Sequence, residues 1–276
     1  MLSILSDRSY RHLFMAQIIA LIGTGLATVA LGLLAYDLAG DRAGAVLGTA
    51  LAIKMSAYIL VAPVAAAFAD KFPRRTMLVT LDLVRAMVAF ALPFVTQIWE
   101  IYILIFILQS ASAAFTPTFQ ATIPDILPDE RDYTRALSLS RLAYDLESVI
   151  SPMLAAALLT VMSFHNLFAG TAVGFLASAI LVVSVTLPRM QALTVHRTIY
   201  DKTTRGMRIF LKTPRLRGLL ALNMAVAAAS AMVIVNTVVL VQADFGFSQR
   251  STAIALAFFG VGSMISALIL PRLLDK

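Results

Sequence analysis

The chain of 276 residues contains no cysteine, which excludes disulfide bonds, thiolate zinc sites and cysteine nucleophiles. Histidine is scarce, and His12, His165 and His196 are too scattered for an HExxH or similar metal-binding spacing. Charged residues make up only 13% of the chain, against about 25% in soluble domains. No basic stretch is interleaved with stacking aromatics, so the net charge of +7 does not indicate a nucleic-acid partner. We expect no metal and no other cofactor.

Hydrophobic residues make up 60% of the chain, and its mean hydropathy is +0.87. This composition is typical of an integral membrane protein, because a soluble domain is about 45–50% apolar. A helix needs about 20 apolar residues to cross a bilayer, so the length allows roughly eight to ten crossings. The first apolar run, from Leu13 to about Leu38, is too long for the core of a signal peptide. We therefore expect a multi-pass membrane protein without a large soluble catalytic domain.

The hydropathy pattern predicts eight membrane-spanning segments. None shows the alternating pattern of barrel strands, and in lipid only helices and closed barrels satisfy their own backbone hydrogen bonds. The sequence therefore predicts an all-α membrane protein of about eight transmembrane helices. The segments are approximately 13–36, 46–69, 76–95, 101–121, 139–162, 167–187, 218–241 and 252–270.

The distribution of basic residues predicts the orientation in the membrane. With a cytoplasmic N-terminus, 19 Lys and Arg residues lie on the inner side, including Arg85 and Arg141 near helix entrances. The outer side then carries only Arg42 and Arg250, and Lys54 falls inside a span. Because cytoplasmic loops are enriched in Lys and Arg, both ends of the chain are expected in the cytoplasm and the protein in the plasma membrane.

One long polar segment, residues 188–217, separates six predicted spans from two. It carries eight Lys and Arg residues and the acidic Asp201. Two interpretations stay open: an amphipathic helix over about 199–212 on the inner leaflet, or a solvated linker. The predicted organisation is a six-helix bundle over 1–187, a basic cytoplasmic linker over 188–217, and a partial second bundle over 218–276.

A weak internal repeat relates the last two spans to the first two. The sequence AFADKFPRR follows the second span and PRLLDK ends the eighth, with Asp70-Lys71 and Asp275-Lys276 in matching places. The residues before the first and seventh spans are also similar, and such symmetry is common in transporters. We therefore expect spans seven and eight to begin a second copy of the first bundle, which the chain does not complete.

The segment from Ala66 to Arg75 resembles the loop signature G-x-x-x-D-[RK]-x-G-[RK]-[RK] of the major facilitator superfamily. Asp70, Lys71, Arg74 and Arg75 match it, whereas Ala and Pro replace its two glycines. The stretches TMLVTLDLVRA, SDRSYRHLFMAQIIALIGTGL and SASAAFTPTFQATIPDILPDE resemble the efflux branch that includes macrolide and siderophore exporters.

This resemblance implies transport by alternating access, in which two six-helix bundles rock around a central cavity, in many members in exchange for protons. It assigns Asp70, Lys71, Arg74 and Arg75 to a latch that braces the outward-facing state. Two departures stand out. The helix-five G-P-x-x-G-G element of exporters reads here as SPMLAA from Ser151, and no arginine occurs around Gln109 in helix four.

Ionisable residues inside the spans are costly, so each requires a reason. Lys54 lies near the middle of the second span, and Arg141, Asp145 and Glu147 lie together in the fifth. Arg141 and Asp145 are four residues apart and can neutralise each other, which leaves Glu147 on nearly the opposite face. Glu147 is therefore a proton-coupling carboxylate or a partner of Lys54 in a water-accessible cavity, or else it belongs to a structural ion pair or extends its side chain to the membrane interface. Asp145, Lys54 and Arg141 are the other candidates for proton coupling.

Two groups of polar residues each follow one face of a predicted span. They are Gln17, Thr24 and Thr28 on the first span, and Gln109, Ser112 and Thr116 on the fourth. These side chains either line a substrate cavity or hold helices together by packing.

We expect a secondary active transporter that exports small amphiphilic molecules, with the lipid bilayer, a small-molecule substrate and the proton gradient as its partners. The alternative is a truncated membrane remnant that does not transport. An intramembrane enzyme is not expected, because the spans contain no paired catalytic carboxylates, histidine-rich ligand set or serine dyad.

Overall fold

The computed structural model describes the chain apart from residues 1, 69–71, 186–205, 207 and 275–276. Within the described residues the structure consists of eight long helices joined by short turns, without strands. Over the described residues, each of the eight predicted segments lies mainly on one helix, so the prediction of an all-α bundle is confirmed. The helices are α1 (Arg8–Ala39), α2 (Ala43–Phe68), α3 (Arg74–Ala91), α4 (Ile98–Ile126), α5 (Glu130–Leu158), α6 (Phe164–Val183), α8 (Pro214–Val239) and α9 (Gln249–Leu274).

Five segments of the described chain are long and apolar enough to cross a membrane. The first of them, Arg8–Ala67, contains both α1 and α2, which are joined by a tight turn at Gly40. Helices α5 and α9 are not among these five segments, and the apolar half of α5 carries Arg141, Asp145 and Glu147. The hydrophobic character of the other helices is explained by the bilayer, whereas these three charges require a function or a partner within the protein.

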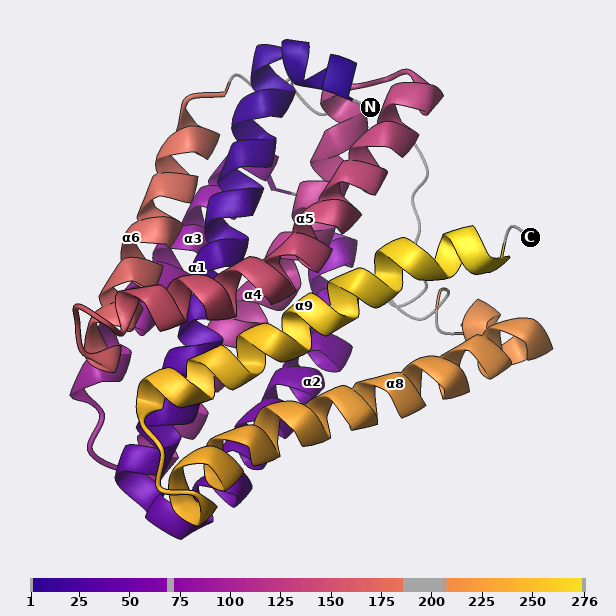
Figure 1. Cartoon of the computed structure of the whole chain (residues 1–276). Helices are drawn as coiled ribbons and strands as arrows, with labels where there is room; N and C mark the ends of the chain where they lie inside the picture. Colours follow the sequence, from indigo (N-terminus) through magenta and orange to yellow (C-terminus); the bar gives the residue numbers. More distant parts are fainter. Residues whose placement is uncertain (1, 69–71, 186–205, 207, 275–276) are drawn as a thin grey trace.

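Helices α1 to α6 pack into one group around α1, which is buried along most of its length (Figure 1). Helix α1 contacts α6 and α5, α3 contacts α6 and α4, and α2 contacts α4. Small residues allow the closest approach: Thr171 of α6 donates its hydroxyl hydrogen to the carbonyl oxygen of Gly23 at 2.9 Å. A Cβ atom at Gly23 would lie 3.3 Å from the carbonyl oxygen of Thr171. Close packing of small residues is the usual basis of helix association in membranes.

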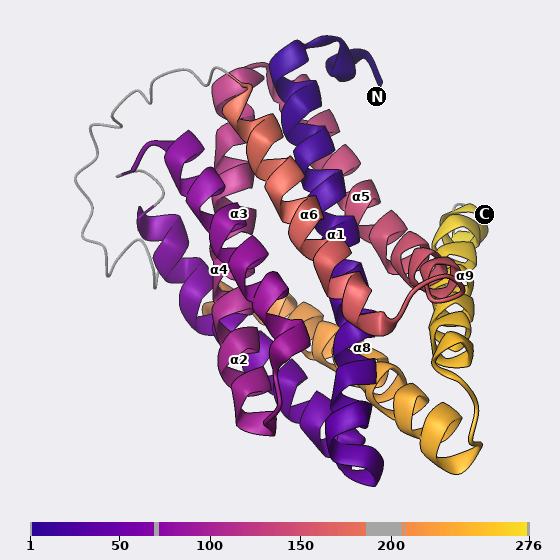
Figure 2. The ribbon, with the colours of Figure 1, turned by 90° about the vertical axis from the view of Figure 1, so that its left-hand side faces the viewer.

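Helices α8 and α9 form a hairpin beside this group, and Figures 1 and 2 show it joined to the rest near the turn between α1 and α2. The end of α8 packs there against α1 and α2, with Val238 next to Gly32 and Val239 next to Gly44. Helix α9 packs against α5. The hairpin therefore contacts the six-helix group through α1, α2 and α5, which are three of the five helices that line the polar cavity described below.

The two hairpins of the proposed repeat turn through the same type of residue. Gly40 follows α1 with φ of 53°, and Gly246 lies between α8 and α9 with φ of 65°. Positive φ is readily adopted by glycine and disfavoured for residues with a side chain. This shared turn chemistry supports the relation between residues 8–68 and 214–274.

The segment 188–217 lies largely outside the described residues. Residues 208–212 are helical and exposed, and α8 begins at Pro214. The amphipathic helix considered for about 199–212 is therefore described only at its end.

Candidate functional site: a polar cavity between five helices

A polar cavity of about 280 Å³ lies inside the six-helix group. Its lining residues come from α1, α2, α3, α4 and α5, and many of them are polar or charged although the surrounding helices are apolar. They are Gln17, Ala20, Leu21, Thr24, Thr28, Lys54, Tyr58, Arg85, Ser112, Phe115, Thr116, Tyr144 and Glu147.

Five of the six residues that the sequence suggested for a cavity line this one, on α1 and α4. The threonine hydroxyls donate to carbonyl oxygens one turn earlier in their own helices, at 2.9 Å for Thr24, 3.0 Å for Thr28 and 3.3 Å for Thr116. Gln17 accepts a hydrogen bond from Ser140 of α5 at 3.0 Å. The hydroxyl oxygens of Thr24, Thr28 and Thr116 can still accept a hydrogen bond from a bound molecule or from water.

Gln109 is the exception among those six residues. It is buried in α4 and does not line the cavity, and its Oε1 has no hydrogen-bond partner among the described residues. Gln109 and Ser112 are three residues apart and therefore lie on the same side of α4. The cavity extends along this side as far as Ser112 but does not reach Gln109.

Lys54 and Glu147 bring opposite charges to the cavity from two helices that are far apart in the sequence. Each lies near the midpoint of its helix, Lys54 on α2 and Glu147 on α5. Both side chains line the same cavity, where opposite charges attract each other. Glu147 also lies against α1, because a Cβ atom added at Gly25 would come within 2.5 Å of its Oε1. The structure thus joins the two unpaired charges that the sequence placed in different spans.

Arg141 and Asp145 pair with each other, as their four-residue spacing predicts. The distance from Arg141 Nε to Asp145 Oδ1 is 3.3 Å, and the two side chains are 79% and 52% exposed. Neither residue lines the polar cavity. The structure therefore separates this pair from Lys54 and Glu147.

Arg85 lies in a different place from that expected. The basic-residue count put it near a helix entrance, but it is buried inside the bundle and lines the cavity. Its guanidinium forms an ion pair with Asp82 and lies 4.1 Å from the ring centre of Phe115 and 4.6 Å from that of Phe175. Ser178 of α6 donates to Asp82 Oδ2 at 2.7 Å. Hydropathy missed this because a neutralised pair one helical turn apart is tolerated inside the membrane, whereas an isolated arginine is not.

Two tyrosines complete the cavity, and sequence reasoning missed both. Tyr58 is four residues after Lys54, and Tyr144 is three before Glu147, so each shares a helix face with a charged residue. The Tyr144 hydroxyl lies 3.4 Å from Thr116 Oγ1. The spacing of three or four residues from a charged residue is the sequence signal that could have identified both tyrosines.

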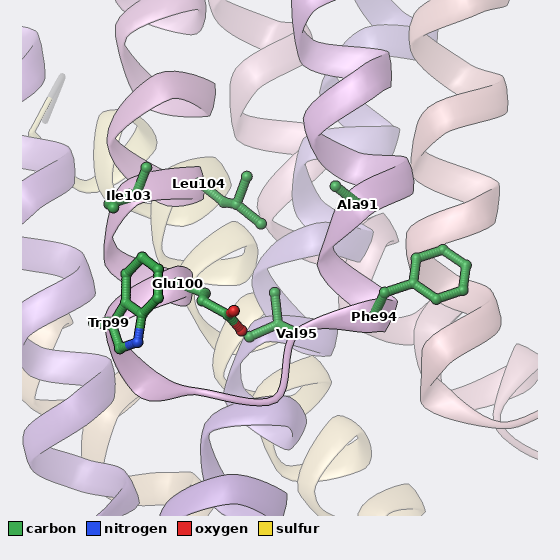
Figure 3. Close-up of a pocket in the computed structure, with 7 residues that line it drawn as sticks. All are labelled: Ala91, Phe94, Val95, Trp99, Glu100, Ile103 and Leu104. Carbon is green, nitrogen blue, oxygen red and sulfur yellow. The ribbon is translucent and has the colours of Figure 1, made fainter.

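An apolar pocket of about 300 Å³ lies at the turn between α3 and α4 (Figure 3). Its acidic residue, Glu100, accepts hydrogen bonds from the backbone N–H groups of Thr96 and Gln97, both at 2.9 Å. Glu100 therefore stabilises the start of α4. Trp99 and Phe94 form the exposed rim. This pocket offers no charged group that is free of a structural role.

A family model of the Major Facilitator Superfamily matches residues 13–276. The chain belongs to this superfamily. Among curated members it is 24% identical over 220 residues to the uncharacterized MFS-type transporter YfiS of Bacillus subtilis (strain 168), a match that covers 78% of this chain and 52% of YfiS. It is 25% identical over 154 residues to macrolide efflux protein A of Enterococcus faecalis, covering 52% of this chain and 47% of that protein. The chain thus spans about half the length of the curated relatives it matches.

Solved superfamily structures share the fold. A bacterial homolog of the human lysosomal transporter Spinster, in an inward-facing and unoccupied conformation, aligns with a TM-score of 0.73 at 15% identity, over 99% of this chain and 64% of that chain. The D323A mutant of the nucleoside transporter NupG aligns with a TM-score of 0.71 at 14% identity, over 96% and 68%. These matches confirm the multi-pass helical fold of the superfamily.

The superfamily's signature loop joins α2 to α3, and Asp70 and Lys71 lie outside the described residues. The other two matching residues bind neighbouring helices. Arg74 Nε lies 2.6 Å from Asp125 Oδ2 near the end of α4, and Arg75 donates to the carbonyl oxygen of Val183 at the end of α6. Both arginines therefore tie the start of α3 to adjacent helix ends.

The helix-five element that departs from the exporter pattern still provides close packing. Ser151 lies directly against Gly25 of α1, and Ala155 and Ala156 are buried. Small residues at these positions allow α1 and α5 to approach, which brings Glu147 to the edge of α1.

Proposed function

We propose that the chain acts as a secondary active transporter that exports small amphiphilic molecules in exchange for protons. The observation that carries this proposal is the polar cavity, which is lined by both Lys54 and Glu147 near the middle of their helices. The similarity to macrolide efflux proteins supports export as the direction and amphiphilic molecules as the substrate class.

Exchange follows from competition for one carboxylate. Placing a charge at the bilayer centre costs roughly 2.5–3.5 kcal/mol on insertion scales, so Glu147 is stabilised by a nearby cation or by protonation. When it is ionised, Lys54 or a cationic substrate neutralises it. When it is protonated, that attraction is lost and a bound cation is released. A proton and a substrate that cannot both occupy Glu147 produce antiport when access alternates between the two sides.

The proposed organisation places the six-helix bundle in residues 1–187, a basic cytoplasmic linker in 188–217 and the first part of a second bundle in 218–276. Both ends are proposed to face the cytoplasm from the plasma membrane. The excess of Lys and Arg on the inner loops supports this topology. The loop residues Asp70, Lys71, Arg74 and Arg75 are proposed to brace the bundle when the cavity opens outward.

The test is transport by the purified chain in proteoliposomes with an imposed pH gradient. A labelled macrolide and a cationic dye serve as probes, and a Glu147→Gln variant is compared with Glu130→Gln, an exposed acid at the start of the same helix. We expect the gradient to drive transport by the wild type and Glu130→Gln, whereas Glu147→Gln shows no difference between energised and unenergised vesicles.

Gradient-driven transport that is unchanged in Glu147→Gln would refute the coupling role. The alternative, that this chain alone does not transport, is tested by the same measurement. Its supporting observation is that the chain spans about half the length of its curated relatives. Correctly inserted wild-type chain without gradient-driven movement of either probe would favour that alternative.

A further inference from the structure

Ser151 of α5 brings a buried hydroxyl without a hydrogen-bond partner close to the proposed proton site. The residue is fully buried, and its Oγ atom has no partner among the residues that the structure describes. Thr24 and Thr28 of α1 show the usual arrangement, in which the hydroxyl donates to a carbonyl oxygen one turn earlier in its own helix. Because an unpaired buried hydroxyl is costly, the Ser151 hydroxyl requires an explanation.

The carboxylate of Glu147 is the acceptor that the geometry offers. Glu147 and Ser151 are four residues apart and therefore lie on the same face of α5. A Cβ atom added at Gly25 of α1 would lie within 2.5 Å of both Glu147 Oε1 and Ser151 Oγ. At most about 5 Å therefore separates the two oxygen atoms, and a hydrogen bond between them needs about 2.7 Å. A change of rotamer at either side chain can close that difference.

Gly25 provides the space in which these two side chains meet. Their oxygen atoms occupy the volume that a methyl group would take on α1. Glu147 lines the polar cavity, whereas Ser151 does not. The carboxylate therefore borders the cavity, and the hydroxyl lies beside it in the packed contact between α1 and α5.

We propose that the Ser151 hydroxyl donates a hydrogen bond to the ionised Glu147 carboxylate and so controls when this residue accepts a proton. Ser151 is then a positioning residue of the proton site, and the inference rests on the proposed function. A hydrogen bond to a charged carboxylate is stronger than one to the neutral acid. The hydroxyl therefore favours the ionised form, and protonation requires a higher proton concentration than it would without Ser151.

Other titratable groups also face Glu147, but none of them changes when Ser151 is replaced. Those that line the cavity from α2, α3 and α5 are Lys54, Tyr58, Arg85 and Tyr144. The residues of α1 and α4 that line the cavity are not titratable. Helix α9 also packs against α5, and its Arg250 is exposed at the start of that helix. A difference between the wild type and a Ser151 variant therefore reports the hydroxyl itself.

The experiment titrates Glu147 by infrared difference spectroscopy on the full chain in lipid nanodiscs. A protonated carboxyl group has a C=O stretching band, and the part of that band that is lost in Glu147→Gln belongs to Glu147. Ser151→Ala removes the hydroxyl and adds no volume, so α1 and α5 can pack as before. We expect the midpoint of the Glu147 titration to move to higher pH by about one unit, which is a tenfold gain in proton affinity.

The matched control is Ser110→Ala on α4. The hydroxyl of Ser110 also has no partner among the described residues, and Ser110 contributes neither to the cavity nor to the contact with Gly25. Its midpoint should equal that of the wild type. A wild-type midpoint in Ser151→Ala would overturn the proposal and leave Ser151 with a packing role alone. So would a shift to lower pH, because the hydroxyl would then favour the protonated form.

A chemical measurement checks the same midpoint. Dicyclohexylcarbodiimide modifies protonated carboxyl groups in apolar surroundings, and mass spectrometry quantifies its adduct on the peptide that contains Glu147. The pH at which modification falls to half should rise in Ser151→Ala and stay at the wild-type value in Ser110→Ala. The same half-modification pH in both variants would contradict the proposal.

Neither measurement requires transport, so failure here is distinguishable from failure of the proposed function. A shifted midpoint in Ser151→Ala together with unchanged gradient-driven transport in Glu147→Gln would retain the hydrogen bond and reject proton coupling. An unshifted midpoint together with loss of gradient-driven transport in Glu147→Gln would retain coupling and reject the role of Ser151. A Glu147 band that does not change between about pH 4 and about pH 10 would overturn both.

Discussion

Replacing Asp82 by asparagine should destabilise the bundle strongly, although the change removes only a charge. Asp82 is fully buried and holds two groups, the Arg85 guanidinium and the Ser178 hydroxyl. Asparagine keeps the shape and an acceptor oxygen. What it cannot do is neutralise Arg85, which stays between the rings of Phe115 and Phe175.

The magnitude follows from two independent estimates. Breaking a buried ion pair by removing one partner costs about 3–5 kcal/mol. An uncompensated arginine in the membrane interior costs roughly 2.5–3.5 kcal/mol on insertion scales. We therefore expect a loss of about 3 kcal/mol, which corresponds to a fall in apparent Tm on the order of 10 °C for a chain of this size.

The assay is thermal unfolding of the detergent-purified chain, followed by loss of the monodisperse gel-filtration peak. The matched control is Asp132→Asn, because Asp132 and Arg135 form an exposed pair with the same three-residue spacing, 3.0 Å apart. Exposed pairs contribute about 0–1 kcal/mol, so the control should lose little stability. Equal, small losses in the two variants would show that Arg85 does not depend on Asp82.

A double variant, Asp82→Leu with Arg85→Met, separates the charge from the packing. Replacing a buried ion pair by hydrophobic residues of similar volume is often neutral or stabilising. We expect the double variant to recover most of the stability that Asp82→Asn loses. A double variant as unstable as Asp82→Asn would contradict the electrostatic explanation and point to shape instead.

Two further predictions concern contacts between helices. Gly25→Ala should destabilise the bundle by about 1–3 kcal/mol, because the new methyl group overlaps Ser151 on α5. The control Gly218→Ala should not destabilise it, because the Cβ atom of that variant lies in open space. A Gly25→Ala chain with wild-type Tm would mean that α1 and α5 are packed less closely. Arg74→Gln should cost about 1–3 kcal/mol, because it removes the ionic partner of the partly buried Asp125. The charge swap Arg74→Asp with Asp125→Arg should restore part of that loss, and the same unfolding assay measures both. Equal instability of the swap and the single variant would show that the charge pairing itself is not the stabilising element.

Helix number and type were predictable because each segment carries its own evidence. A run of about 20 mostly apolar residues must form a helix in lipid whatever its neighbours are, so α1 to α4, α6 and α8 could each be recognised from their own segment. The pairing of Arg141 with Asp145 is equally local, since residues four apart share a helix face. The polar faces of α1 and α4 followed from the same periodicity.

Contacts between distant segments could not be read in this way. Lys54 and Glu147 are separated in the chain by two helices, α3 and α4, and they come together only because α2 and α5 line the same cavity. The ion pair between Arg74 on α3 and Asp125 on α4 likewise depends on how two helices pack. Gln109 does not line the cavity, because helix packing decides which part of the polar face of α4 borders it.

The sequence by itself determined which segments are helices and which side of each is polar, because hydropathy and helical periodicity act over a few residues. The tertiary structure alone decided that Arg85, with Asp82 one turn away, is buried against Phe115 and Phe175, and that Lys54 and Glu147 line one cavity. The physical reason is that the energy of a charge inside a membrane depends on the neighbours that other helices supply, and those neighbours exist only in the folded bundle.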